Sequence, residues 1–133
     1  MNREIKFRGQ IIGSHKWAIG FYLQSVKQDK TFYIVADVLN SELMPIKPET
    51  LGQFTGLKDK NGTEIYEGDI IMVNDKNRYG KVKKLKYKVE FIDGSFMCIL
   101  IDDKYPEVYP KSMKNQPNME VIGNIHENPE LLQ

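Results

Sequence analysis

The stretch of sequence that decides the fold runs from Lys81 to Phe91 and reads KVKKLKYKVEF. Within it, Leu85, Tyr87, Val89 and the final phenylalanine alternate with lysines and one glutamate. Successive side chains of a β-strand point to opposite faces. This period of two therefore predicts a strand with one buried face and one solvent-facing face.

The residues on either side extend this strand into a hairpin. Asp93-Gly94 is a turn pair, and the apolar run from Phe96 to Ile101 predicts a returning, buried strand. At the other end, Val82 is out of phase with the alternation. This predicts a β-bulge near Lys83-Lys84.

Short runs of Val, Ile, Phe and Tyr recur between turn signals along the rest of the chain, whereas helical periodicity is scarce. Asn61-Gly62 supplies the positive φ of a tight hairpin, and Asn128-Pro129 is typical of a helix start. The further strands that we expect lie at residues 4–8, 17–23, 31–39, 69–73 and 120–125. We therefore expect a mainly β chain: an N-terminal β unit, a hairpin-rich curled sheet or small SH3-like barrel in the C-terminal part, and a short C-terminal helix.

The segment from Asn40 to Thr50 is expected to be an extended connector. Pro45 and Pro48 each lack the backbone N–H that a helix interior or a central strand requires. The 133 residues suit one domain. We therefore expect a single domain over residues 1–133, within which an N-terminal β unit (1–45) and a C-terminal β unit (51–133) can be distinguished.

Composition and charge exclude several classes of protein. Nineteen basic and eighteen acidic residues give a net charge of +1, so the chain as a whole has no strong attraction to nucleic acid or membranes. The apolar run from Phe96 to Ile101 is too short to span a bilayer, and the charges at residues 3–8 do not fit a signal peptide. The single cysteine, Cys98, suits a reducing compartment. We therefore expect a cytoplasmic protein without a membrane partner.

Motifs for catalysis, cofactor binding or metal binding are not found in the sequence. His15 and His126 have no cysteine at metal-ligand spacing, and the glycines form no phosphate-binding loop. Residues 59–64 lack the ligand positions of a calcium loop and are better explained by a hairpin turn. Cys98 lies in an apolar run, where a thiol is normally unreactive. We expect a protein that is not an enzyme, with no catalytic, cofactor-binding or metal-binding residues.

One segment, residues 76–88, is strongly basic and contains two tyrosines. A basic strand with aromatic residues can follow a phosphate backbone. Lysines on the solvent-facing side of a strand also prevent sheets from pairing edge to edge, so both interpretations stay open. The candidate nucleic-acid contacts are Lys76, Arg78, Lys81, Lys83, Lys84, Lys86 and Lys88.

Three stretches of the chain resemble the YopX family, whose members are small proteins of phages and prophages. The first, from Ile46 to Ile71, contains GQFTGLKDKNG and IYEGDII. The others are REIKFR at residues 3–8 and VIGNIHENPELL at residues 121–132. The resemblance implies a mainly β protein from a phage or prophage that works in the host cell, and it supplies no activity or catalytic residue.

These observations favour an accessory protein that acts as a non-enzymatic interaction module. We expect it to bind a protein partner, or a second copy of itself, through β surfaces. The alternative is a nucleic-acid-binding accessory factor that uses residues 76–88. Binding to nucleic acid weakens steeply as salt rises, so salt dependence separates the two hypotheses.

Overall fold

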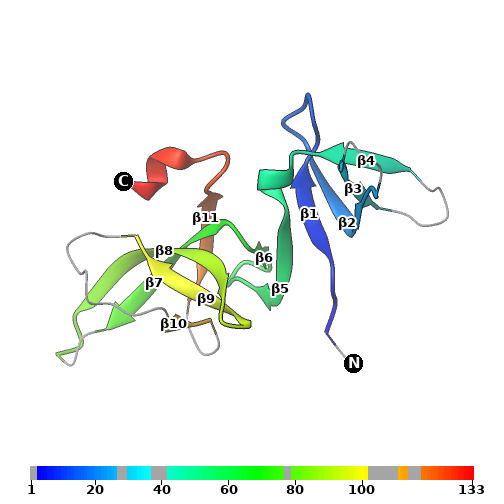
Figure 1. Ribbon diagram of the computed structural model, residues 1–133. Helices are drawn as coiled ribbons and strands as arrows, with labels where there is room; N and C mark the ends of the chain where they lie inside the picture. Colours follow the sequence, from blue (N-terminus) through cyan, green and yellow to red (C-terminus); the bar gives the residue numbers. More distant parts are fainter. Residues whose placement is uncertain (1–2, 27–29, 37–41, 77–78, 102–110, 114–117) are drawn as a thin grey trace. The chain divides into compact units, whose positions relative to one another are not determined.

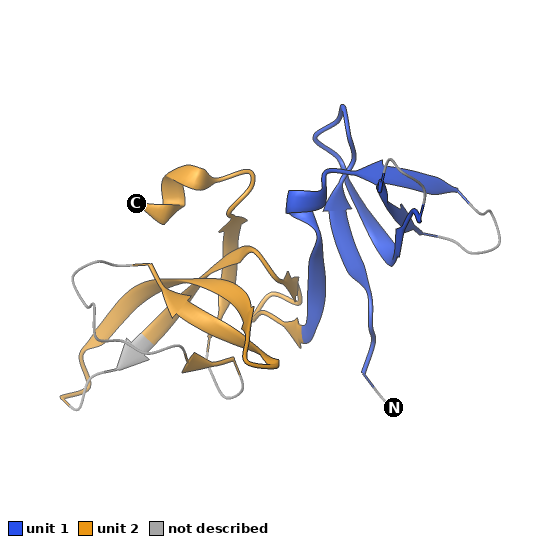
Figure 2. Ribbon diagram, in the orientation of Figure 1, with its two compact units in different colours: residues 1–56 blue, residues 57–133 orange. Residues whose placement is uncertain are grey.

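The computed structural model describes residues 3–26, 30–36, 42–76, 79–101, 111–113 and 118–133 (Figure 1). Within these residues the chain forms eleven strands and two short 3₁₀ helices. The predicted mainly β fold is confirmed. The chain folds as two compact units, unit 1 with residues 1–56 and unit 2 with residues 57–133 (Figure 2).

Unit 1 is built on antiparallel strands in the order β4-β3-β2-β1-β5. The strand β1 begins at Phe7, later than the expected start at Glu4. The elements are β1 (Phe7–Gln10), β2 (Trp17–Gln24), β3 (Phe32–Val35), β4 (Leu43–Ile46), the 3₁₀ helix η1 (Pro48–Thr50) and β5 (Gly52–Lys58), whose last residues belong to unit 2.

The sheet of unit 1 curls until its edge strand β4 meets the residues that follow β1. Ile11, just after β1, forms a bridge with Ile46 at the end of β4. The Ile12 N–H donates to the Pro45 carbonyl over 3.0 Å. Ala18, Ile34 and Ile46 are buried on the inside of this curl. We expected a curled sheet in the C-terminal part of the chain, and a sheet of this form is found in unit 1.

The expected connector from Asn40 to Thr50 contains a strand, so that prediction was wrong in part. Residues 43–46 form β4, which pairs with β3 and is the edge of the sheet. The Pro45 carbonyl accepts a hydrogen bond from Ile12, on the side of β4 away from β3. The nitrogen of Pro45 faces the same side, so its lack of an N–H removes no hydrogen bond between β3 and β4. Pro48 occupies the first turn of η1, where its fixed φ is favourable. Residues 37–41 lie outside the described part.

Unit 2 contains an antiparallel sheet in the order β10-β9-β8-β7-β11. Its described strands do not close into a barrel, because β10 and β11 are two separate edges. Of our two predicted forms, a curled sheet or a small SH3-like barrel, the described strands therefore form a sheet and not a barrel. The elements are β6 (Glu64–Tyr66), β7 (Asp69–Lys76), β8 (Val82–Ile92), β9 (Ser95–Leu100), β10 (Lys111–Ser112), β11 (Glu120–Asn124) and the 3₁₀ helix η2 (Pro129–Leu132).

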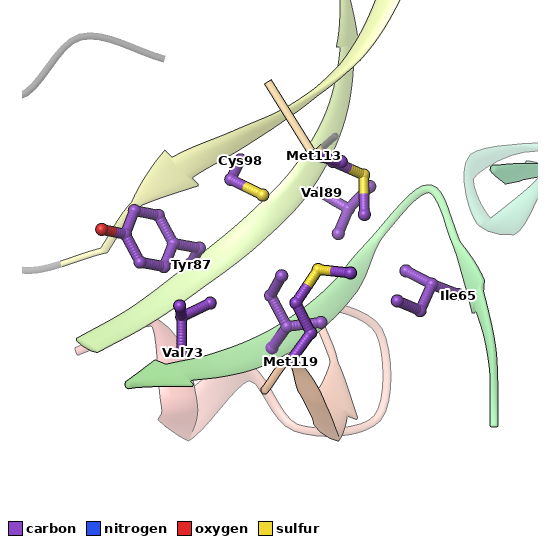
Figure 3. Close-up of a cluster of buried hydrophobic side chains, with 8 residues drawn as sticks. Ile65, Val73, Tyr87, Val89, Cys98, Met113 and Met119 are labelled. Carbon is purple, nitrogen blue, oxygen red and sulfur yellow. The ribbon is translucent and has the colours of Figure 1, made fainter. Parts of the chain in front are cut away.

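The core of unit 2 lies on one face of this sheet (Figure 3). Tyr87 and Val89 are fully buried there, together with side chains from neighbouring strands, which confirms the predicted alternation over this part of β8. Phe91 departs from it: its side chain is 52% exposed and packs edge-on against Phe96, 5.1 Å between ring centroids. The buried residues of this core are Ile65, Ile71, Val73, Tyr87, Val89, Cys98, Met113 and Met119.

The predicted β-bulge near Lys83-Lys84 is absent from the pairing of β7 with β8. Their register continues without a shift from Ile70↔Lys88 to Lys76↔Val82. Val82 is 52% exposed, on the same face as Lys84. The Val82 side chain therefore remains exposed to solvent, and no β-bulge turns it toward the core.

The expected short C-terminal helix is present as a single 3₁₀ turn, η2. Asn128 stands at the N-cap position and Pro129 follows, as predicted, but no side-chain bond caps the helix. The Asn128 Oδ1 instead accepts a hydrogen bond from the Asn124 N–H over 3.2 Å. The side chain therefore closes the turn between β11 and η2.

Candidate interaction surface

The strand β2 presents apolar side chains on both of its faces. Ala18 and Tyr22 point to the core of unit 1. Ile19, Phe21 and Leu23 alternate with them and are 46%, 56% and 48% exposed. Alternation on a strand places these three side chains in one row on the opposite face.

Neighbouring strands widen this row into a surface. Phe21 pairs with Val35 of β3, which pairs with Leu43 of β4, a residue that is 51% exposed. Side chains directly opposite each other on paired strands share a face. We call the surface formed by Ile19, Phe21, Leu23 and Leu43 the outer face of unit 1.

A cation lies at one border of the outer face. Arg8 of β1 is paired with Ile19, and its guanidinium lies 4.8 Å from the ring centroid of Trp17. The four residues of the outer face itself carry no charge. Large contiguous apolar surface is uncommon on a monomer and marks contact with another molecule.

Sequence reasoning identified the strand at residues 17–23 but missed its outer face. Ala18, Gly20 and Tyr22 belong to one face of this strand, and Ile19 and Phe21 belong to the other. Neither face carries a charged residue. A period of two separates two faces only when one of them is hydrophilic. The signal that could have indicated the outer face is this lack of polar residues on either side of a strand.

The candidate nucleic-acid contacts are distributed over β7, β8 and the residues between them. Lys76 is the last residue of β7, and Arg78 lies outside the described residues. Lys81, Lys83 and Lys84 are exposed. These three therefore present their side chains to solvent near the end of the β7–β8 hairpin.

Two further lysines of this set are held by contacts within unit 2. The Lys86 Nζ donates to the backbone oxygens of Leu131 and Gln133, over 3.1 and 3.4 Å. The Lys88 Nζ lies 2.6 Å from a carboxylate oxygen of Glu90. The row of lysines along β8 is therefore not uniformly presented to solvent.

Asp59 is a buried carboxylate with a structural role. Its Oδ1 accepts from the N–H groups of Asn61 and Thr63, and its Oδ2 accepts from the N–H of Val121, over 2.8, 2.9 and 2.9 Å. Burial acts to raise the pKa of Asp59, but these hydrogen bonds and the nearby Lys60 charge outweigh it and hold the pKa below 3.8. The carboxylate therefore ties the β5–β6 turn to β11.

Asp69 is the second buried carboxylate, and it also satisfies the backbone. Its Oδ2 accepts from the Tyr66 N–H over 2.8 Å. The hairpin turn at Gly68 is held to β8 by the bond from its N–H to the Val89 carbonyl. Neither buried carboxylate indicates acid–base chemistry, because each accepts hydrogen bonds from backbone N–H groups.

The other candidate reactive groups are also dispersed. Burial raises the pKa of the Cys98 thiol to about 11, against the smaller opposing effect of the Lys111 charge. A thiol of this kind is protonated and unreactive at neutral pH. His15 is exposed in a turn of unit 1, whereas His126 of unit 2 packs beside Gly68. In the described ranges, no three His, Cys, Asp or Glu side chains gather as a metal-ligand set.

The described part of the chain contains no helix with the length and apolar character needed to cross a membrane.

Comparison with known proteins places the chain in a family. No curated protein matches it. The crystal structure of protein EF1440 from Enterococcus faecalis is similar, with 26% sequence identity, a TM-score of 0.55, and coverage of 99% of this chain and 100% of that chain. The family described as YopX protein matches residues 6–133, which include all three stretches of the resemblance except the first residues. The chain therefore belongs to the YopX protein family.

Proposed function

We propose that this protein is a non-enzymatic interaction module that binds a protein partner through the outer face of unit 1. In this proposal it is an accessory protein of phage origin that works in the cytoplasm of the host cell. The observation that carries the proposal is the row of Ile19, Phe21 and Leu23 on a face of β2 that the core does not use.

The size of the outer face supports a transient contact more than a permanent one. Completing the burial of four half-exposed side chains contributes about 3–6 kcal/mol, since full burial of one is worth about 1.5–3 kcal/mol. A matching apolar surface on the partner contributes a similar amount. Association itself costs about 4–15 kcal/mol, so these opposing terms nearly balance. We therefore expect reversible binding that needs further polar contacts to be specific.

The test uses a double variant of the outer face, Phe21→Thr with Leu23→Thr. Threonine removes the apolar surface and keeps a high strand propensity. The matched control is Val82→Thr with Phe91→Thr, because both residues lie on a strand of unit 2 and both are 52% exposed. Host-cell proteins are captured on each purified variant after nuclease treatment, and the captured protein is then purified for titration.

We expect the outer-face variant to bind the purified partner at least about tenfold more weakly than the wild type, with the control unchanged. Thermal melting of both variants checks that they remain folded. Equal affinity of the wild type and the outer-face variant would show that the contact is made elsewhere, and the proposal would fail.

A further inference from the structure

The turn between β5 and β6 contains Asn61, the one asparagine of the chain that a glycine follows. Asn61 and Gly62 are both exposed to solvent. Asparagine is a chemically labile residue, because the next backbone nitrogen can attack its side-chain amide. A glycine in the next position has no Cβ to hinder that attack. The sequence and the exposure therefore indicate a site of spontaneous covalent modification.

The reaction is deamidation, and water is its only co-reactant. The backbone nitrogen of Gly62 forms a bond to the side-chain carbon Cγ of Asn61 and gives up its proton. The bond from Cγ to the side-chain nitrogen breaks, and ammonia leaves with that proton. Water then opens the resulting cyclic imide at either of its carbonyls, which leaves aspartate or isoaspartate at position 61. Both products carry a new negative charge, and isoaspartate also lengthens the backbone of the turn by a methylene group.

In the folded turn the attacking nitrogen is engaged in a hydrogen bond. The Gly62 N–H donates to the Asp59 carbonyl over 3.0 Å. The N–H groups of Asn61 and Thr63, on either side of it, donate to the Asp59 Oδ1 over 2.8 and 2.9 Å. The Val121 N–H donates to the Asp59 Oδ2 over 2.9 Å and fixes the turn to β11. Attack on Cγ requires Gly62 to release its hydrogen bond and the backbone to rotate, and these contacts oppose both changes.

We propose that Asn61 is a deamidation site that Asp59 protects, so that modification follows local opening of the β5–β6 turn. Local openings of a native protein need less free energy than global unfolding. The rate of a reaction confined to the open form is proportional to the population of that form. After the reaction, the new carboxylate repels the Asp59 carboxylate and disfavours closing of the turn. Deamidation therefore weakens the connection between this turn and β11 irreversibly.

This inference is separate from the proposed function, because it concerns unit 2 and a covalent change. The competing explanation is that Asn61 reacts only when the whole of unit 2 unfolds. In that case, any substitution that destabilises unit 2 accelerates the reaction. Under our proposal, only substitutions in the turn do so. The rates of deamidation in variants inside and outside the turn therefore separate the two explanations.

The experiment incubates the purified protein at mildly alkaline pH and physiological temperature, and mass spectrometry of proteolytic peptides follows deamidation at residue 61. Asp59→Asn should deamidate at least about tenfold faster than the wild type, because its turn opens more often. The matched control is Leu131→Ala, which removes packing between η2 and β11 but none of the bonds to Asp59. It should react within about threefold of the wild type. Asn61→Gln should remove the signal and so confirms the site.

Wild type unfolded in concentrated urea gives the rate of the open chain, and the folded wild type should react at least about tenfold more slowly. Equal rates in the folded and the unfolded protein overturn the proposal. So does an unchanged rate in Asp59→Asn, or equal acceleration in Asp59→Asn and Leu131→Ala. Thermal melting checks that each variant is folded during the incubation. Asp59→Ser, whose hydroxyl oxygen still accepts a backbone hydrogen bond, replaces Asp59→Asn if that variant does not fold.

Discussion

At the scale of single residues, Gly62 has the backbone conformation that the sequence predicted. Its φ is +82°, and its N–H donates to the Asp59 carbonyl over 3.0 Å in the turn between β5 and β6. We expect Gly62→Ala to lower the free energy of unfolding by roughly 1 kcal/mol or more, because a Cβ is strained at this φ. Urea denaturation measures the change. Thr63→Ala is the control, since the exposed Thr63 contributes its backbone N–H to the turn and should tolerate the change; an unaltered midpoint for Gly62→Ala would contradict the prediction.

Asp59 makes a second prediction at this scale, on the dependence of stability on pH. Its pKa is lower in the folded chain than in the unfolded one, so the ionised carboxylate stabilises the fold above about pH 4 and this contribution is lost as pH falls through the folded pKa. Asp59→Asn should cost about 2 kcal/mol at neutral pH, because one amide oxygen cannot accept from three N–H groups.

The check is urea denaturation of wild type and Asp59→Asn at about pH 7 and about pH 3. The difference between the two proteins should shrink at the lower pH, because below its unfolded pKa the carboxyl takes up a proton in the unfolded wild type and the advantage of the ionised, folded form declines. A difference that stays constant with pH would mean that the charge of Asp59 does not contribute.

At the scale of elements, the short helix η2 is a structural part of unit 2. Lys86 on β8 donates to its backbone oxygens, and a Cβ at Gly123 of β11 would lie 3.0 Å from the Leu131 Cδ1. Ile70, on the same face of the sheet as Lys88, is fully buried. The helix therefore covers the face of the sheet that is opposite the core.

Two neighbouring leucines of η2 test this arrangement. Leu131→Ala should lower the free energy of unfolding by about 1–2 kcal/mol, toward the low end for deletion of a leucine side chain, because the residue is only partly buried. Leu132 is more exposed, so Leu132→Ala should change it by less than about 0.5 kcal/mol. Guanidinium denaturation measures both. Equal effects of the two substitutions would contradict the packing of η2 on the sheet.

At the scale of the whole molecule, we predict that the chain associates with itself at high concentration. The outer face of unit 1 carries no charge that would repel a second copy, and two antiparallel copies of such a face are self-complementary. Light scattering should report a mass above the 15.5 kDa of one chain, rising with concentration. The Phe21→Thr, Leu23→Thr variant should stay near the monomer mass; a wild type that remains at 15.5 kDa would refute the prediction.

The sequence by itself determined the secondary structure class and the turns of this protein. Tyr87 and Val89 are buried because they alternate with lysines, and such alternation is a local property that any strand of the same sequence would have. Gly62 and Asp93-Gly94 also act locally, since a positive φ is decided by the residue and its neighbours. The family membership follows from the same local motifs.

Where the local pattern does not distinguish the two faces of a strand, only the tertiary structure decided which residues are exposed. Pro45 lies in a strand because β4 is at a sheet edge, and that position depends on Ile12, which is distant in sequence. Ile19 and Phe21 are as apolar as the core residues beside them, so only the curl of the unit 1 sheet determines which set is buried. Lys86 differs from Lys84 only because η2 returns over β8. Each outcome depends on contacts between distant segments, which a local pattern does not encode.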